Sequence, residues 1–260
     1  MIPEQVAHRI VVFSGKGGVG KTTVAVNLAC TLAERAMRVG LLDADITGPN
    51  VLQMMGIRSA PRHGTEGLLP HERHGVKTVS LASMLSPEAA VIWRGPMRSK
   101  AIQQLLNDTS WGELDALIVD LPPGTGDEAL TIAQETSPQL AIVVTTPQEV
   151  ALLDARRAIT FARKLEIPLI GIVENMSGFV CPSCGTRIDL FGTNGGLLEA
   201  KRQSVLFLGA VPIDPATRES GDQGEPIVLA NPTASVSEAF RQIAGAIERS
   251  LGCGGAAAQE

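Results

Sequence analysis

The sequence has little of what marks secreted, membrane-bound or nucleic-acid-binding proteins. It holds four cysteines in 260 residues, too few for a disulfide framework in a chain of this size. No apolar run approaches the ~20 residues of a membrane span, and residues 1–8 do not resemble a targeting segment. The net charge of −5 gives no general attraction to nucleic acid or to an anionic membrane. We therefore expect a cytoplasmic protein that binds neither nucleic acid nor membrane.

Short apolar runs alternate with helical patterns along most of the chain. The expected strands are Ile10–Ser14, Val39–Asp43, Ala116–Asp120, Leu140–Thr145, Leu169–Val173 and Leu206–Val211. The expected helices, with apolar residues at spacings of three and four, are Thr22–Arg35, Ser99–Leu106, Glu128–Glu135, Glu149–Leu165, Gly196–Arg202 and Ser235–Leu251. Continuous apolar strands are typical of sheets that helices cover on both faces. The order predicts an α/β fold with a doubly wound, mostly parallel sheet.

A glycine-rich loop joins the first expected strand to the first expected helix. Residues 15–22 read Gly-Lys-Gly-Gly-Val-Gly-Lys-Thr, which is the spacing of a phosphate-binding P-loop. Backbone N–H groups of such a loop bind a polyphosphate, while Lys21 reaches the β and γ oxygens and Thr22 offers a hydroxyl to Mg²⁺. The glycines also fit the dinucleotide pattern G-x-G-x-x-G, but a dinucleotide needs neither Lys21 nor Thr22. We therefore expect a nucleoside triphosphate with Mg²⁺, bound by Gly15, Lys16, Gly17, Gly18, Val19, Gly20, Lys21, Thr22 and Thr23.

Two acidic loops follow later strands, at the edge of the sheet where ligands of such folds bind. Asp45 lies just after the second expected strand, where it is a candidate to orient the attacking water or, alternatively, to cap a turn. Asp120 ends the third expected strand and is expected to hold Mg²⁺ through water. Gly124 lacks a Cβ, so its N–H is expected to approach the γ-phosphate. The catalytic residues expected from these motifs are Lys21 and Asp45.

One domain accounts for residues 1–251, because 44% hydrophobic content supports a sizeable core. Residues 58–87, which are rich in Gly, Pro and His, depart from the alternating order and are expected to form a hairpin insertion beside the nucleotide site. Residues 252–260 are expected to form a disordered tail.

A second chemical signal is the pair Cys181 and Cys184, which forms a C-x-x-C motif in the loop 175–187. Two thiolates at this spacing can share a metal, yet zinc and a four-iron cluster usually require about four ligands. The chain offers no second C-x-x-C, but a two-fold dimer would bring four thiolates together. A redox dithiol, half a zinc ribbon and two plain loop cysteines are the alternatives. Cys30 is expected as a buried thiol, and Cys253 either as a spare ligand or without a role.

Several motifs together resemble the Mrp/ApbC family of iron-sulfur carrier ATPases. They are the P-loop at 15–22, Asp-Ala-Asp-Ile-Thr-Gly-Pro-Asn at 43–50, Trp-Arg-Gly-Pro-Met at 93–97, Asp-Leu-Pro-Pro-Gly-Thr-Gly-Asp at 120–127, Val-Glu-Asn-Met-Ser at 173–177 and Cys-Pro-Ser-Cys at 181–184. The resemblance covers nearly the whole chain. It implies a P-loop NTPase fold of the deviant Walker A (SIMIBI) type, shared with the cell-division ATPase MinD, the partition ATPase ParA and the nitrogenase iron protein.

The resemblance also implies a function. ATP and Mg²⁺ would be bound and ATP slowly hydrolysed, with Lys16 reaching across a homodimer to the phosphates of the partner subunit. Asn175 would contact the adenine, with Pro212 and Asp214 near the same base. A [4Fe-4S] cluster would bridge the two subunits through Cys181 and Cys184, arrive from a donor and pass to apo iron-sulfur proteins.

Two other functions are compatible with the same nucleotide-binding motifs. One is a MinD- or ParA-like regulatory or positioning ATPase without a cluster. Against it, the segment after Leu251 has no basic residue for a membrane-binding helix, and the net acidic chain has only 22 lysines and arginines. The other is electron transfer of the nitrogenase-reductase type, in which the potential of the cluster matters more than its release.

Overall fold

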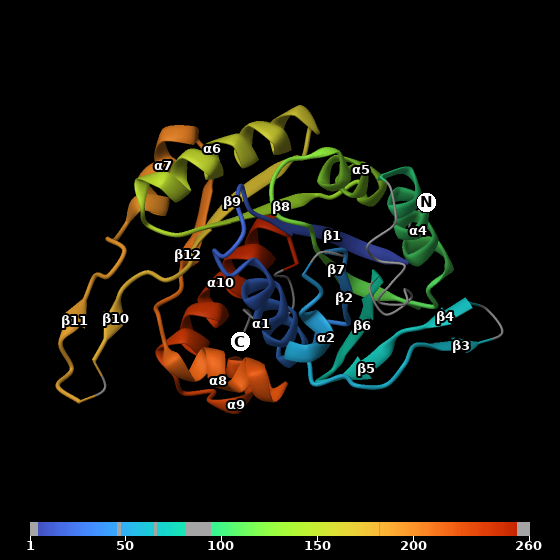
Figure 1. The fold of residues 1–260 in the computed structure, drawn as a ribbon, viewed down its shortest axis with the longest axis horizontal. Helices are drawn as coiled ribbons and strands as arrows, with labels where there is room; N and C mark the ends of the chain where they lie inside the picture. The colour runs from blue at the N-terminus through green and yellow to red at the C-terminus, as the bar shows by residue number, and fades with distance from the viewer. Residues whose placement is uncertain (1–4, 46–47, 65–66, 82–94, 182, 254–260) are drawn as a thin grey trace, which may run out of the picture.

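The computed structural model describes residues 5–45, 48–64, 67–81, 95–181 and 183–253. Its centre is an eight-stranded sheet in the order β12-β9-β8-β1-β7-β2-β6-β5 (Figure 1). The strands of this sheet are β1 (Val6–Phe13), β2 (Val39–Asp43), β5 (His71–Arg73), β6 (Val76–Ser80), β7 (Leu114–Asp120), β8 (Leu140–Thr145), β9 (Leu169–Glu174) and β12 (Leu206–Ala210). All neighbours pair in parallel except β5, which runs antiparallel to β6 at one edge. The expected doubly wound, mostly parallel sheet is confirmed.

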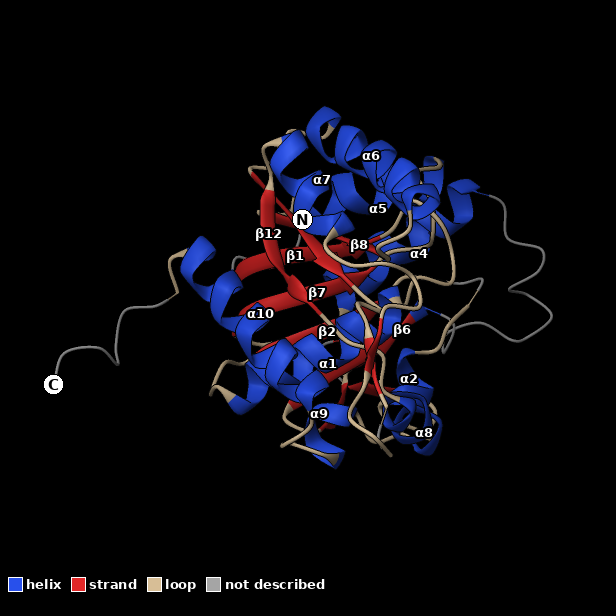
Figure 2. Ribbon diagram, turned by 90° about the vertical axis from the view of Figure 1, so that its left-hand side faces the viewer, coloured by secondary structure: helices blue, strands red, loops and turns tan. Residues whose placement is uncertain are grey.

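Helices cover both faces of this sheet (Figure 2). They are α1 (Lys21–Glu34), α2 (Val51–Met54), α4 (Gly95–Asp108), α5 (Asp127–Thr136), α6 (Glu149–Lys164), α7 (Gly195–Gln203), α8 (Pro215–Gln223), α9 (Ile227–Ala230) and α10 (Ser235–Leu251). Helices α1, α9 and α10 pack on one face, while α4, α5, α6 and α7 pack on the other.

The alternation of side chains explains why the strands are continuously apolar. In β1, Ile10 and Val12 point into the core beneath α1 and α10, whereas Val11 and Phe13 point into the core beneath α5 and α6. The last four residues of β1 are therefore all buried, and an apolar run rather than an alternating pattern results.

The segment 58–87 is only partly the expected insertion. It contains an antiparallel hairpin of β3 (Arg62–Gly64) and β4 (Gly67–Leu69), together with β5. Strand β6, however, belongs to the central sheet, where it pairs in parallel with β2. Its short run Val-Lys-Thr-Val-Ser is interrupted by Lys77, whose ammonium donates to the Trp111 carbonyl at 2.6 Å. The polar residues mask the strand in the sequence. Residues 65–66 and 82–87 of this segment lie outside the described residues.

A separate hairpin follows β9. It consists of β10 (Phe179–Val180) and β11 (Arg187–Ile188), with Phe179 paired to Ile188, and it projects from the body below β12 and α7 (Figure 1). Cys181 and Cys184 lie at its turn. Of the expected tail, Gly252 ends α10 in a left-handed conformation with φ 74°, and 254–260 lie outside the described residues. Among the described residues, no helix combines the length and apolar character that a membrane crossing requires.

Candidate functional site

The P-loop joins the end of β1 to the start of α1, as the sequence predicts. Gly18 and Gly20 adopt the left-handed conformation, with φ of 82° and 85°, which glycine tolerates without a steric penalty. Gly20 precedes α1 without any side-chain cap, so the first N–H groups of the helix face the loop. An anion is stabilised there by these N–H groups and by the helix dipole.

The first glycine of the loop lies so close to helix α6 that no side chain fits at its position. A Cβ on Gly15 would lie 2.2 Å from the carbonyl oxygen of Asp154 in α6, whereas a Cβ on Gly17 would have no neighbour within 4 Å. Gly15→Ala is therefore expected to lower the free energy of unfolding by about 1–3 kcal/mol or more through overpacking. Gly17→Ala is the matched control and should cost less than about 1 kcal/mol. Urea unfolding of the nucleotide-free protein measures both, and equal losses would contradict the contact between the P-loop and α6.

Lys21 lies beneath the loop among acidic side chains. Its ammonium is 2.8 Å from Asp120 Oδ1 and 3.6 Å from Asp45 Oδ2. The Thr22 hydroxyl donates to Asp120 Oδ2 at 2.7 Å. Asp43, the register neighbour of Asp120 across β2 and β7, completes the group. Four charged side chains, all at most 7% exposed, thus place three carboxyl groups around one ammonium.

Asp120 and the Thr22 hydroxyl offer two adjacent oxygen atoms of the kind that a divalent cation binds. Carboxylates and a threonine hydroxyl are hard oxygen ligands, which Mg²⁺ prefers. Burial raises the pKa of Asp120, and Lys21 and Thr22 oppose that effect. Burial and the nearby Asp120 raise the pKa of Asp43 to about 7, although the Asp45 N–H and the Ser80 hydroxyl donate to it. Thr22 and Asp120 lie side by side, and their role toward Mg²⁺ stays a prediction.

The raised pKa of Asp43 has a consequence for stability. Between pH 4 and pH 7 the folded state retains a proton that the unfolded state has lost, so the stability contributed by this site falls as the pH rises through that window. Asp43→Asn removes the buried charge and leaves an acceptor for the Asp45 N–H. In metal-free protein it should raise the free energy of unfolding by about 1 kcal/mol or more at pH 8, which is roughly 2–4 °C in Tm. Calorimetry at pH 8 and pH 5 tests this, since little change is expected at pH 5. A lower Tm at pH 8 would contradict it.

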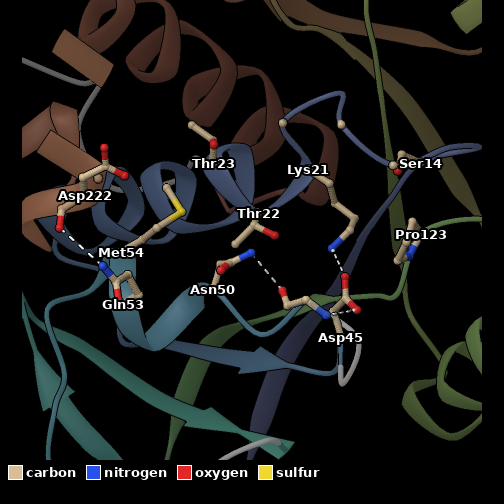
Figure 3. Close-up of a pocket in the computed structure, with 15 residues that line it drawn as sticks. Ser14, Lys21, Thr22, Thr23, Asp45, Asn50, Gln53, Met54, Pro123 and Asp222 are labelled. Carbon is tan, nitrogen blue, oxygen red and sulfur yellow. Dashed lines mark hydrogen bonds and ion pairs between the residues drawn. The ribbon is translucent and has the colours of Figure 1, made fainter. Parts of the chain in front are cut away.

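A cavity of about 360 Å³ opens over the P-loop (Figure 3), within the range of small-molecule sites. Its lining residues are Ser14, Gly17, Gly18, Gly20, Lys21, Thr22, Thr23, Asp45, Gly48, Asn50, Gln53, Met54, Pro123, Gly221 and Asp222. Lys21 points toward Asp45 in this view, and Gln53 and Asp222 close the opposite end. The cavity therefore runs from the phosphate loop to helices α2 and α8.

The wall made by α2 and α8 is not predicted from the sequence. Asp214 is a helix-start signal, because its carboxylate accepts from the Ala216 N–H at 2.9 Å and Pro215 occupies the first helical position. That signal could have located α8 and hence Asp222. None of the described residues of 58–87 lines the cavity.

The residues predicted to contact adenine lie elsewhere than on this cavity wall. Asn175 donates its side-chain N–H to the Val19 carbonyl at 2.8 Å, directly beneath the P-loop. Asp214 caps α8, and Pro212 precedes it after β12.

Two residues predicted to contact the phosphates lie near the P-loop. Gly124 has φ 90° and donates its N–H to the Ser14 carbonyl at 2.9 Å. Lys16 is half-buried at the start of the loop, and its carbonyl accepts from the Ser14 hydroxyl. The roles of these residues toward nucleotide remain predictions.

The two cysteines of the motif lie at the turn of the β10–β11 hairpin. Cys181 donates its N–H to the Thr186 carbonyl at 2.9 Å and accepts from the Gly185 N–H at 2.8 Å, which closes the turn. Cys184 is exposed, with Sγ 3.3 Å from Thr186 Oγ1, and hydrogen bonding from Thr186 lowers the pKa of its thiol. A lowered pKa favours the thiolate, which is the form that binds metal.

The other cysteines differ. Burial raises the pKa of Cys30 to about 12, as expected for a thiol in the core. Burial also raises the pKa of Cys253 at the end of α10. Among the described residues there is no group of three or more His, Cys, Asp or Glu side chains arranged to hold a metal. The β10–β11 hairpin of one chain thus offers two thiols to a metal.

The fold and the P-loop site together define a P-loop nucleoside triphosphatase. The family model described as ParA: NUBPL iron-transfer P-loop NTPase matches residues 5–248, and the chain belongs to this family. The resemblance to iron-sulfur carrier ATPases is confirmed, as is the expectation of an ATPase.

Relatives named iron-sulfur cluster carrier protein agree with this assignment. The one from Methanocaldococcus jannaschii is 50% identical over 244 residues, covering 92% of this chain and 83% of the relative. The one from Deinococcus radiodurans is 49% identical over 241 residues, covering 92% of this chain and 68% of the relative.

Solved structures support the same fold. A nucleotide-binding protein from Archaeoglobus fulgidus in complex with ADP superposes with a TM-score of 0.79 at 37% identity, covering 92% of this chain and 94% of that one. The cell division ATPase MinD from Pyrococcus furiosus gives a TM-score of 0.73 at 23% identity, covering 94% of this chain and 99% of that one. The second likeness concerns the fold alone.

Proposed function

We propose that this protein is an ATP-dependent carrier of iron-sulfur clusters. A homodimer would bind one [4Fe-4S] cluster between Cys181 and Cys184 of each subunit, receive it from a donor and transfer it to apo iron-sulfur proteins in the cytoplasm. The observation that carries the proposal is the pair of accessible thiols at the turn of a projecting hairpin on a P-loop ATPase body. Two thiols per chain leave a four-ligand cluster incomplete, and a second copy completes it.

The nucleotide site fits ATP with Mg²⁺. The N–H groups at the start of α1 would hold the phosphates, while Lys21 would stabilise the charge that develops during hydrolysis. Thr22 and Asp120 would hold Mg²⁺, and Asp45 would orient the attacking water. Lys16 would act on the phosphates bound by the partner subunit, so that hydrolysis depends on dimer formation. We infer slow hydrolysis, since a carrier gains nothing from idle turnover.

The proposal is tested by anaerobic reconstitution of the purified protein with iron and sulfide. We expect about four irons and four sulfides per dimer, with absorbance near 400 nm, and transfer of the cluster to the apo form of a [4Fe-4S] enzyme. Light scattering before and after loading reports the dimer. Uptake of zinc alone, or of no metal, by a protein that still binds ATP would overturn the carrier function and favour a regulatory ATPase.

A further inference from the structure

Glu174, the last residue of β9, contacts the chain on both sides of the cysteine hairpin, which is the β10–β11 hairpin that carries Cys181 and Cys184. Glu174 is fully buried, and its Oε1 accepts from the Ser177 hydroxyl at 2.6 Å and from the Asn194 N–H at 3.2 Å. Its Oε2 accepts from the Gly196 N–H. Ser177 precedes β10, whereas Asn194 and Gly196 follow β11. One carboxylate therefore contacts both sides of the hairpin base, whose first side is also held by backbone hydrogen bonds between Ser177 and Val211 and between Gly178 and Ile213.

The next residue holds the P-loop. Asn175 is 7% exposed and donates its side-chain N–H to the Val19 carbonyl at 2.8 Å. The contact is close, because a Cβ on Gly20 would lie 2.1 Å from Asn175 Nδ2. The backbone N–H of Asn175 donates to the Thr145 carbonyl at 2.7 Å, which fixes this residue at the end of the sheet. Two consecutive residues thus contact two distant sites.

We propose that Glu174 and Asn175 connect the P-loop to the cysteine hairpin, so that nucleotide bound at the P-loop sets the accessibility of Cys181 and Cys184. The inference rests on the proposed function for the assignment of nucleotide to the P-loop and of cargo to the hairpin. Phosphates bound at the P-loop would act on the Val19 and Gly20 backbone, hence on Asn175, and through Glu174 on the hairpin base. Coupling of this kind is reciprocal: cargo on the thiols changes nucleotide affinity by the same factor.

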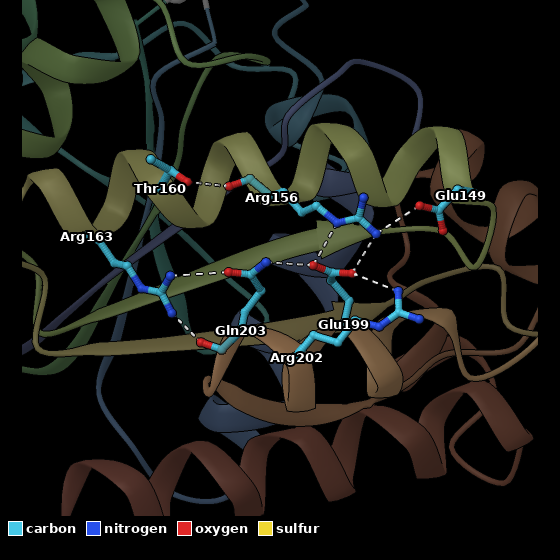
Figure 4. Close-up of polar contacts among 7 residues, drawn as sticks. All are labelled: Glu149, Arg156, Thr160, Arg163, Glu199, Arg202 and Gln203. Atoms are coloured by element: carbon cyan, nitrogen blue, oxygen red, sulfur yellow. Dashed lines mark hydrogen bonds and ion pairs between the residues drawn. The ribbon is translucent and has the colours of Figure 1, made fainter.

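A second connection provides the control. Glu199 of α7 is also fully buried and accepts two hydrogen bonds from Arg156 of α6, each 2.9 Å long (Figure 4). Arg156 also contacts Glu149, and α6 reaches the P-loop at Gly15. This network joins α6 to α7 beyond the first turn of α7, whereas Glu174 holds the residues that leave the hairpin.

The test uses thiol alkylation of the reduced, metal-free protein. All proteins carry Cys253→Ser, so that only the hairpin thiols and the buried Cys30 remain. N-ethylmaleimide is added with and without saturating Mg-ADP, and modification of Cys181 and Cys184 is followed by mass spectrometry. Light scattering confirms that the mass of the protein is the same in both conditions. We expect the nucleotide to change the rate by about fivefold or more, the lower end of typical coupling between sites.

Glu174→Gln should abolish this change while nucleotide affinity, measured by calorimetry, stays within about twofold. Glutamine has the same size, but its amide presents a donor where the carboxylate accepts from N–H and O–H groups. Ser177→Ala removes one of the three hydrogen bonds and should give an intermediate response in a variant that perturbs the fold less. Glu199→Gln alters an equally buried carboxylate and should keep the full response.

The proposal would be overturned if nucleotide changed the alkylation rate of Glu174→Gln as much as that of the protein with Glu174. It would also be overturned if nucleotide left the rate unchanged in the protein with Glu174. Loss of the response in Glu199→Gln alone would assign the coupling to α6 and α7 and overturn it as well. The outcome is independent of cluster chemistry. A protein that takes up no cluster but shows the response disproves the carrier function and retains the coupling.

Discussion

Replacing Cys181 or Cys184 by serine is expected to reduce cluster uptake from about four irons per dimer to none. Each substitution removes two of the four thiolates at the shared site, because the dimer carries every substitution twice. The fold should remain intact, since Cys184 is exposed and Cys181 is only half-buried at the turn of the hairpin. Iron and sulfide analysis after anaerobic reconstitution measures the loss, and calorimetry should show Tm within about 2 °C of the unsubstituted protein.

Cys253→Ser is the matched control for this prediction. Cys253 is likewise a half-exposed thiol, but it lies at the end of α10 rather than on the hairpin. Its substitution should leave the iron content unchanged. If Cys184→Ser kept its iron, Cys184 would not be a ligand of the cluster and the bridged arrangement would be wrong.

Lys21→Ala is expected to have the second large effect, on both hydrolysis and stability. Loss of the ammonium should lower the rate of ATP hydrolysis at least 10²–10³-fold, the usual cost of removing one group that stabilises transition-state charge. It also leaves the fully buried Asp120 without its partner at 2.8 Å. Breaking a buried pair in this way typically costs about 3–5 kcal/mol at neutral pH.

The pH dependence distinguishes this mechanism from a general packing defect. Lys21 opposes the rise in the pKa of Asp120, so in Lys21→Ala this carboxyl binds a proton more readily in the folded state. The loss of stability should therefore shrink as the pH falls and Asp120 becomes neutral in the variant and in the unsubstituted protein. Urea unfolding at pH 8 and pH 5.5 measures it. Lys16→Ala, a half-buried lysine of the same loop, should cost less than about 0.5 kcal/mol. A Lys21→Ala loss that is independent of pH would refute the charge argument.

The sequence predicts those elements best in which a local residue pattern is set by one physical requirement. The apolar runs of β1, β7 and β8 predict buried parallel strands because both of their faces meet helices. The P-loop is equally readable, since left-handed glycines, an ammonium and a hydroxyl must stand at fixed spacing. Asp120 is found from its position at the end of a strand.

Contacts between residues distant in the sequence are not readable in this way. Strand β6 has too few apolar residues to stand out, and only its pairing with β2 defines it. The cavity wall at Gln53 and Asp222 depends on the packing of α2 against α8. Glu174 looks like a polar residue ending a strand, and its bonds to Ser177, Asn194 and Gly196 arise only when the hairpin folds back. Local patterns carry no signal for such pairings.

The hairpin that carries Cys181 and Cys184 adds none of its described residues to either hydrophobic core, and Val180 and Ile188 on its strands are exposed. Mutations in it are therefore nearly neutral for the body of the protein. Natural selection can lengthen, shorten or recode this ribbon while the ATPase beneath it stays the same. The same lack of core contacts makes the hairpin a transplantable unit for engineering other P-loop proteins, provided that the contacts of Glu174 at its base are carried with it.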